Sequence, residues 1–217
     1  MAEKVKNVTI ITPKGIASYP YINRADTKFK AEGDYKCKLI VNANDPKVQE
    51  LVALLDAAAD EFVEATITEL KAKGGKGIAK AKAVKKFIPY EAEFDDEGNE
   101  TDNIILNAKT TAQAKNKQGE VFHKTIKVYD SKGTFLKNPP SIYGGSTLKL
   151  SCTLIPFYNA ATDTAGVTLR MEAVQVIELV SGGTGPCPFG EEEDGYTGDT
   201  GFGDEPAPNG YTENEDF

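Results

Sequence analysis

Lysines and aromatic rings share the polar faces of the strands that this sequence predicts. The positions concerned are Lys36, Lys38, Lys109, Lys127, Tyr129, Lys149 and Phe157. Lysines neutralise phosphates, and aromatic rings stack on bases, each stacked base contributing roughly 1–3 kcal/mol. Tyr21 and Arg24 add a ring and a cation near the N-terminus. These residue types predict a sequence-independent site for an unpaired polynucleotide; the alternative is that the lysines are ordinary solvated strand residues.

The sequence contains no recognisable motif for catalysis or for metal binding. His123 is the single histidine, and the chain contains no Cys-x-x-Cys pair and no Gly-x-Ser-x-Gly motif. Residues 74–77 lack the spacing of a nucleotide-binding P-loop, and residues 95–99 form a predicted turn without the twelve-residue calcium pattern. We therefore predict a binding protein that is not an enzyme and uses no cofactor or metal.

Five predicted strands and one long helix must position these side chains. Alternating apolar residues predict strands over 34–41, 104–113, 121–129, 147–158 and 167–179. Asp45 and Pro46 open a helix with a polar cap and a proline in its first turn, and apolar residues follow at helical spacing to Leu70. We expect an α+β, mainly β fold, in which a small closed barrel packs against the helix.

The apolar face of each predicted strand is assigned to the core. In the strand over 121–129, Phe122, Ile126 and Val128 are expected inside. The inward residues of the last strand are expected to be Val167, Leu169, Met171, Ala173, Ile177 and Leu179. Arg170 belongs to the opposite face of that strand, and Cys37 and Cys152 are expected to be buried thiols.

Residues 71–86 form a separate basic feature. They include seven lysines and no acidic residue, and they have few hydrophobic side chains. Two interpretations remain open, a mobile solvated loop or an arm that contacts phosphates.

The charges of the chain are segregated. The net charge is −8, from 25 basic and 33 acidic residues, yet residues 181–217 contain ten acids and no lysine or arginine. Residues 1–180 therefore carry 25 basic and 23 acidic residues. A slightly basic body is followed by an anionic tail, so the acidic composition does not exclude a nucleic-acid partner.

The tail is predicted to be disordered, since residues 181–217 contain no Leu, Ile, Val or Met. Its aromatic residues recur among the acids, and the last residue is Phe217. Glu213, Glu215, Asp216 and Phe217 combine a ring with dense negative charge, which favours recognition by a basic pocket over a purely solubilising role.

The compartment follows from what the sequence lacks. No apolar run approaches the roughly 20 residues of a membrane helix, and the N-terminus shows no apolar region of a signal peptide. We expect the protein to stay in the compartment where it is made and to have no membrane partner.

Several short segments, in this order, resemble one family. They are Tyr19-Pro20-Tyr21-Ile22, Tyr35-Lys36, Asn44-Asp45-Pro46, residues 128–133, residues 144–149, residues 154–157 and Glu215-Asp216-Phe217. On these segments the chain resembles the replicative single-stranded DNA-binding proteins of tailed bacteriophages of the T7 type, over nearly its whole length.

The resemblance implies a fold, a function and partners. It implies a five-stranded oligonucleotide/oligosaccharide-binding (OB) barrel over residues 1–180 whose groove holds single-stranded DNA, with Lys149 and Phe157 at basic and aromatic groove positions. It also implies strand annealing, and a tail that recruits the replicative polymerase and the helicase-primase. Asn159, Ser151 and Glu32 stand where the family has Trp, Lys and Arg, so Tyr158 or Arg170 is expected to compensate.

Together these observations predict a protein that coats single-stranded DNA during phage replication and recombination, in the cytoplasm of the infected bacterial host. The tail is expected to compete with DNA for the groove. The prediction requires Lys149 and Phe157 to share one positive channel. Two alternatives remain: an annealing or recombination mediator that also binds duplex DNA, and a phage protein-interaction module that binds no nucleic acid. A second copy of the chain is a further candidate partner, which would give a homodimer.

Overall fold

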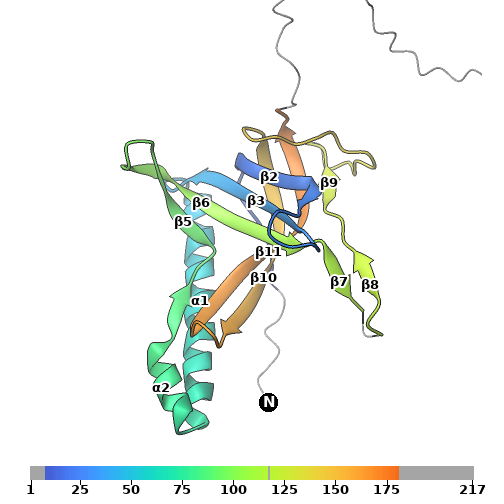
Figure 1. Cartoon of the computed structure of the whole chain (residues 1–217). Coiled ribbons are helices and arrows are strands. Elements are labelled where there is room, and N and C mark those ends of the chain that lie inside the picture. The colour runs from blue at the N-terminus through green and yellow to red at the C-terminus, as the bar shows by residue number, and fades with distance from the viewer. Residues whose placement is uncertain (1–7, 117, 181–217) are drawn as a thin grey trace, which may run out of the picture. The chain divides into compact units, whose positions relative to one another are not determined.

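The computed structural model describes residues 8–116 and 118–180, which form a mainly β structure with two helices (Figure 1). The helices are α1 (Pro46–Ala72) and α2 (Lys76–Ala83). The strands are β1 (Thr9–Ile11), β2 (Gly15–Asp26), β3 (Asp34–Asn42), β4 (Lys85–Phe87), β5 (Tyr90–Phe94), β6 (Glu100–Thr111), β7 (Gln113–Lys115), β8 (Val121–His123), β9 (Lys127–Tyr129), β10 (Thr147–Asn159) and β11 (Thr164–Glu178). The predicted disordered tail, 181–217, lies outside the described residues.

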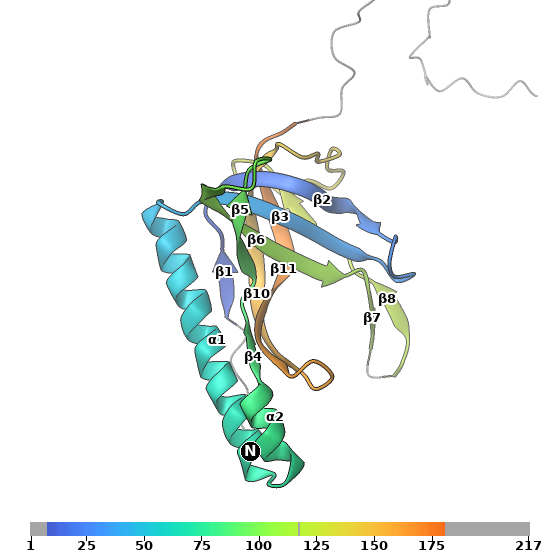
Figure 2. The same ribbon diagram turned by 60° about the vertical axis from the view of Figure 1, so that its left-hand side comes forward.

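The main sheet contains both parallel and antiparallel strand pairs. Five of its strands pair in a closed circuit, in which the last strand pairs again with the first. β2 pairs with β3, β3 with β6, β6 with β11, β11 with β10, and β10 again with β2. The β6–β11 contact is parallel and the other four are antiparallel. β1, β4, β5 and β9 extend this circuit at its edges, whereas β7 and β8 form a separate hairpin (Figure 2).

The apolar side chains of the strands in this circuit form the core. On β3 and β10, the buried residues follow the alternation that the sequence predicted. The side chains that are at most 1% exposed include Cys37, Leu39, Leu106, Leu148, Leu150, Cys152, Leu169 and Met171. The prediction of buried thiols is confirmed, and desolvation raises the pKa of both Cys37 and Cys152 to about 12. Polar-face residues of these strands are thereby held outward.

Helix α1 begins where the sequence predicted. Asp45 is its N-cap and accepts a hydrogen bond from the Lys47 backbone N–H at 2.8 Å, and Pro46 occupies the first turn. Val48, Leu51, Leu55 and Ala59 form the buried face and join the core of the sheet. The helix lies beside β10 and β11 (Figure 1), and its burial explains the apolar spacing along the segment.

The prediction of one continuous strand over 121–129 is wrong. It is divided into β8 and β9, because the Lys124 backbone N–H bonds to Ala112 and the chain then leaves the hairpin to pair with β11. The break separates the two alternation patterns. Phe122 is therefore exposed and not buried, while Ile126 and Val128 enter the core as predicted.

The predicted inward face of the last strand is wrong beyond Met171. The β10–β11 register shifts between Ser151/Ala173 and Cys152/Met171, so Glu172 is an extra residue on β11. Such a bulge reverses the alternation that follows it. Val174 and Val176 are buried in place of the predicted Ala173, Ile177 and Leu179.

The expectation that residues 71–86 are a loop is wrong, because α2 and β4 lie within them. Ala81 is buried, and the Lys80 ammonium donates to the carbonyl oxygen of Ala160 at 3.1 Å. Lys86 makes ion pairs with Asp60 at 2.7 Å and Asp56 at 3.7 Å on α1. The partners are distant in sequence, so local composition did not reveal this order.

Candidate functional site

A groove of about 640 Å³ collects many of the predicted site residues, and we call it the central groove. Its lining residues are Tyr19, Lys36, Cys37, Lys38, Phe87, Pro89, Asn107, Ala108, Lys109, Phe157, Thr168 and Leu169. They come from β2, β3, β4, β6, β10 and β11 and from the residue that precedes β5. The closed pairing circuit is what brings these strands to one place.

A row of one ring and two cations runs across three adjacent strands beside this groove. Tyr21 on β2 is the register partner of Lys36 on β3, and Lys36 is the partner of Lys109 on β6. Directly paired residues share one face of a sheet. The Lys36 ammonium lies 4.9 Å from the centre of the Tyr21 ring, a cation–π distance. The row presents positive charge and an aromatic surface together.

Two groove lysines are held by carboxylates. Lys36 pairs with Asp26 at 2.5 Å, and Lys38 pairs with Glu91 at 3.0 Å. The hydrogen bond from each lysine is the largest cause that lowers the pKa of Asp26 and of Glu91 below its ordinary value. Lys109 makes no ion pair with any residue in 8–116 or 118–180.

The Asp26–Lys36 pair predicts a pH dependence. Lys36→Met should raise the pKa of Asp26 toward its ordinary value of 3.8, with the Lys28 backbone N–H keeping part of the depression. Because the folded pKa is the lower one, the pair stabilises the fold above pH 3.8, and this contribution is lost as the pH falls through the folded pKa. Carboxyl titration by NMR measures the first effect, and unfolding of both proteins between pH 7 and pH 2 measures the second. An unchanged Asp26 pKa in Lys36→Met would contradict the pairing.

Two phenylalanines meet at the other part of the central groove. The rings of Phe87 and Phe157 lie 5.4 Å apart at an angle of 73°, which is edge-to-face packing. Phe157 on β10 and Phe87 on β4 are both register partners of Gly166 on β11. A Cβ atom on Gly166 would lie 2.0 Å from the Phe87 carbonyl oxygen. The missing side chain of Gly166 is therefore what lets β4 bring Phe87 to Phe157.

Gly166→Ala is expected to detach β4 from β11. The added methyl group meets backbone and cannot be accommodated by a side-chain rotation, so we expect a loss of roughly 1–3 kcal/mol in the free energy of unfolding, the usual cost of overpacking. Gly144→Ala is the matched control, since its Cβ would have its nearest contact at 3.7 Å and its φ is not positive. Urea denaturation of both variants tests this; equal losses would contradict it.

Lys127, Tyr129 and Lys149 lie outside the central groove. Tyr129 and Lys149 line a different hollow of about 310 Å³, together with Ile11, Gly133, Leu150, Ser151, Ala173, Val174 and Gln175; we call it the lateral hollow. Lys149 and Phe157, which the sequence analysis expected in one channel, line two different hollows in the structure. Both alternate outward on β10, but eight residues separate them, or roughly 26 Å along a strand.

Three further predicted site residues, Arg24, Tyr158 and Arg170, lie elsewhere on the structure. Arg24 is exposed on β2 and lines a hollow with residues 19–23 and 141–144. The Tyr158 hydroxyl donates to Asp163 at 2.8 Å, and this hydrogen bond raises the pKa of Tyr158. Arg170 Nε donates to Glu172 at 2.6 Å. None of the three lines the central groove.

Sequence reasoning missed Phe87 and did not assign Tyr19 to the site. Phe87 follows Lys85 and Lys86 directly, and a ring after two cations was a usable signal. Tyr19 is 79% exposed and has a φ of 47°, a left-handed conformation that is uncommon outside glycine. This local backbone turn interrupts the alternation of β2, which hid the strand from a pattern search.

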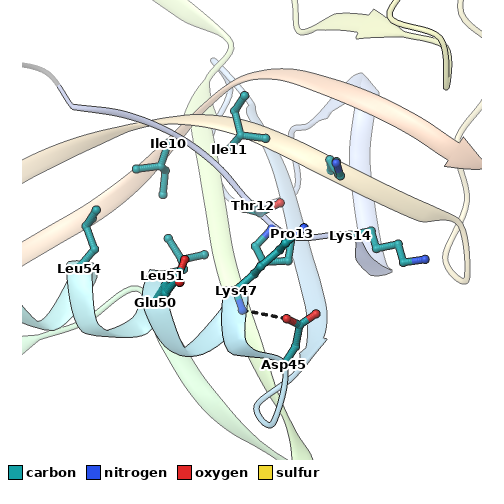
Figure 3. A pocket seen from close by; sticks show the side chains of 11 residues that line it. Ile10, Ile11, Thr12, Pro13, Lys14, Asp45, Lys47, Glu50, Leu51 and Leu54 are labelled. Carbon is teal, nitrogen blue, oxygen red and sulfur yellow. Dashed lines mark hydrogen bonds between the residues drawn. The ribbon is translucent and has the colours of Figure 1, made fainter.

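A further hollow of about 710 Å³ lies between α1 and β1 (Figure 3). Lys14, Lys47 and Lys149 line it, but so do Asp45 and Glu50. Its floor is apolar, with Leu51 and Leu54 of α1 facing Ile10. The opposed charges make this hollow less suited to a polyanion than the central groove.

The part of the chain that the structure describes contains no cluster of metal-binding side chains and no helix that could cross a membrane. In 8–116 and 118–180, no three side chains of His, Cys, Asp or Glu gather as a metal site. Neither α1 nor α2, the helices of that part of the chain, has the length and apolarity to cross a membrane.

The fold is found in phage proteins of one class. The crystal structure of gp2.5, a single-stranded DNA-binding protein encoded by bacteriophage T7, matches with a TM-score of 0.68 and 28% identity, covering 88% of this chain and 98% of that one. A single-stranded DNA-binding protein from bacteriophage Enc34, solved in complex with single-stranded DNA, has a TM-score of 0.50 at 15% identity, covering 82% and 93% of the two chains. The Enc34 likeness concerns the fold alone.

Sequence comparison gives the family. Residues 14–179 match the family described as single-stranded DNA-binding protein, bacteriophage T7. The single-stranded DNA-binding proteins of Escherichia phage T7 and Enterobacteria phage T3 are each 32% identical over 186 residues, covering 83% and 84% of this chain and 78% and 73% of theirs. The chain belongs to the bacteriophage T7 single-stranded DNA-binding protein family, and the resemblance noted in the sequence is confirmed.

Proposed function

We propose that this protein binds single-stranded DNA without sequence preference and coats it during phage replication and recombination. The observation that carries the proposal is the central groove, where Lys36 and Lys109 stand in one row with Tyr21, and Phe87 packs against Phe157. The membership of the chain in a family of single-stranded DNA-binding proteins supports the same function.

The mechanism follows from the two parts of the groove. Phosphates contact Lys36, Lys38 and Lys109, and bases stack on the exposed parts of Phe87, Phe157 and Tyr21. No group of the substrate changes covalently, so the protein acts as a binder and not as an enzyme. A phosphate at Lys36 or Lys38 must replace Asp26 or Glu91, which reduces the net gain from each contact.

The fold that would support this function is a five-stranded OB barrel. The pairing circuit β2–β3–β6–β11–β10 closes on itself, and β6 and β11, the third and fifth of these strands in chain order, are parallel. Closure removes free strand edges and curves the sheet, which gives a concave face for a polynucleotide. Residues 1–180 then form the DNA-binding domain.

The acidic tail, 181–217, supplies a second activity in this proposal. Glu213, Glu215, Asp216 and Phe217 recruit the replicative DNA polymerase and the helicase-primase, and the tail competes with DNA for the cationic groove. Its ten acids and absence of lysine and arginine support both roles. The site of action is the cytoplasm of the infected bacterial host, and a second copy of the chain is a further candidate partner.

A second function, annealing of strands with binding to duplex DNA, is favoured by one specific observation. Lys76 and Lys82 on α2 are exposed, and β4 leads directly from α2 to Phe87 in the central groove. A duplex on these lysines would adjoin a single strand in the groove. The alternative of a phage interaction module without nucleic-acid binding has no support from the comparisons.

Titration of the full-length protein with labelled oligo(dT) and with a duplex of equal length tests the function. We expect tight oligo(dT) binding that weakens with salt by a log–log slope of about −0.7 per phosphate contacted. A full-length tail variant with Glu213→Gln, Glu215→Gln, Asp216→Asn and Phe217→Ala should bind more tightly at low salt. No oligo(dT) binding would overturn the function, and equal affinity of the tail variant would overturn the competition alone.

A further inference from the structure

The lateral hollow joins a cation and a ring that the central groove does not use. β9 lies beside β11 (Figure 1), with Tyr129 opposite Gln175, and β10 places Lys149 opposite the same Gln175 from the other side. Tyr129, Gln175 and Lys149 therefore form a row across three strands, as Tyr21, Lys36 and Lys109 do at the central groove. Both rows have one ring at an end and a lysine at the other.

The ring of this second row is fixed in place. Tyr129 packs edge-to-face on Phe135, with 5.8 Å between ring centres and an angle of 64°, and the two residues form an antiparallel bridge. The Gln175 side-chain amide donates to the carbonyl oxygens of Asp130 and Ser131, at 3.2 Å each. Phe135 is nevertheless 55% exposed, so a flat aromatic surface is held rigidly and left open to solvent.

The surface around this row is cationic. Lys127, Lys132 and Lys149 make no ion pair with another residue of the described part of the chain. The nearby Asp130 carboxylate accepts hydrogen bonds from the backbone N–H groups of Lys132 and Thr134, at 2.9 and 2.7 Å, and is thus taken up by its own turn. In the central groove, by contrast, Lys36 and Lys38 already have acidic partners.

We propose that the lateral hollow is a second subsite for the single strand that occupies the central groove. This inference rests on the proposed function. Lys149 contacts a phosphate in the lateral hollow, and Tyr129 stacks on a base there. Lys127 and Phe135 stand beside it and line a neighbouring hollow of about 480 Å³, where Phe135 packs on Tyr129 and Lys127 is the register partner of Ala173. Along the outward face of β10, Phe157 and Lys149 are roughly 26 Å apart. Arg170, opposite Thr153, lies between them, and its guanidinium pairs with Glu172 at 2.6 Å.

A nucleic acid fits this hollow better than an acidic peptide. The hollow is small, about 310 Å³, and Gly133, Ser151 and Ala173 leave little side-chain volume around the Tyr129 ring. A flat base needs a shallow stacking surface of this kind, with a cation beside it. A peptide anchored by a side chain needs a deeper apolar pocket, as the hollow between α1 and β1 provides.

Oligonucleotide length separates the two subsites. An oligomer of about six thymidines fills the central groove alone, and one of about sixteen reaches both, within the range of roughly 4–16 nucleotides found per OB fold. The full-length double variant Phe135→Ala/Lys149→Gln should bind the sixteen-mer at least about 10-fold more weakly at 50 mM salt, since one stacked base and one phosphate contact are lost. Its affinity for the six-mer should stay within about twofold of that of the unaltered chain, a spread of roughly 0.4 kcal/mol.

The matched control is Phe94→Ala/Lys115→Gln, which removes the same two residue types from exposed positions on β5 and β7. It should change neither affinity, and thermal unfolding should show that both double variants are folded. Equal loss for the two lengths, or no loss for either, would overturn the second subsite. A variant that binds the sixteen-mer normally but no longer binds a peptide of residues 213–217 would also overturn it, in favour of a peptide site. Failure of the unaltered chain to bind either oligomer would instead overturn the proposed function.

Discussion

Replacing both Phe87 and Phe157 by alanine is expected to weaken oligo(dT) binding by roughly 30-fold or more, because each ring stacks a base worth roughly 1–3 kcal/mol. The two rings pack on each other at 5.4 Å and line one groove, so a base placed on either ring is supported by the other. Fluorescence anisotropy with a short oligo(dT) at fixed salt measures the loss. The salt slope should hardly change, since no cation is removed.

A conservative series distinguishes stacking from a general loss of apolar surface. Phe157→Trp should retain the affinity of the unaltered protein, whereas Phe157→Leu should lose most of what Phe157→Ala loses. Phe94→Ala removes a 60% exposed ring from β5, outside the groove, and should bind normally. If Phe157→Leu and Phe157→Trp bound equally well, the stacking role of this ring would be refuted.

The second large effect is expected from Lys36→Gln/Lys109→Gln, which removes both cations of the row across β3 and β6. Each phosphate contact contributes about 0.7 to the slope of log affinity against log salt, so the slope should become shallower by about 1.4. If the variant and the unaltered protein bind equally at 1 M salt, the shallower slope makes the variant bind about 60-fold more weakly at 50 mM salt. At 300 mM salt the same slope gives about 5-fold weaker binding. The charge row therefore matters most at low salt, unlike the phenylalanine pair.

A charge-matched control is needed because any loss of positive charge weakens binding to a polyanion. Lys71→Gln/Lys73→Gln removes two exposed lysines at the end of α1 and changes the net charge by the same amount. Its salt slope should change by much less than that of the groove variant. Similar slopes for the two variants would mean that Lys36 and Lys109 make no direct phosphate contacts.

Elements with one clean amphipathic face were predictable from the sequence. The Asp45 cap with Pro46 gave the start of α1, and the alternation on β3 and β10 placed Lys36, Lys38 and Phe157 on polar faces. Local periodicity carries this information because it determines which side of an element is buried.

What the sequence did not reveal depends on pairing between distant segments. Phe87 reaches Phe157 only because Gly166 is the register partner of both residues. Gly166 follows Phe87 by about 80 residues and Phe157 by about 10, and no local pattern in the sequence encodes either pairing. Alternation placed Lys149 and Phe157 on the same side of β10 but carried no information on their separation around the curved sheet. The extra residue Glu172 likewise reversed a face without any glycine or proline to mark it.

The carboxylates that hold Lys36 and Lys38 have a consequence for turnover on the template. When a phosphate leaves either ammonium, Asp26 or Glu91 is already positioned to take its place, so departure leaves no bare charge to be solvated. Internal counter-ions of this kind lower the net free energy gained from each phosphate contact, so a bound strand is released more readily. In the proposed function, a coat built from such units is displaced from the template without any input of chemical energy.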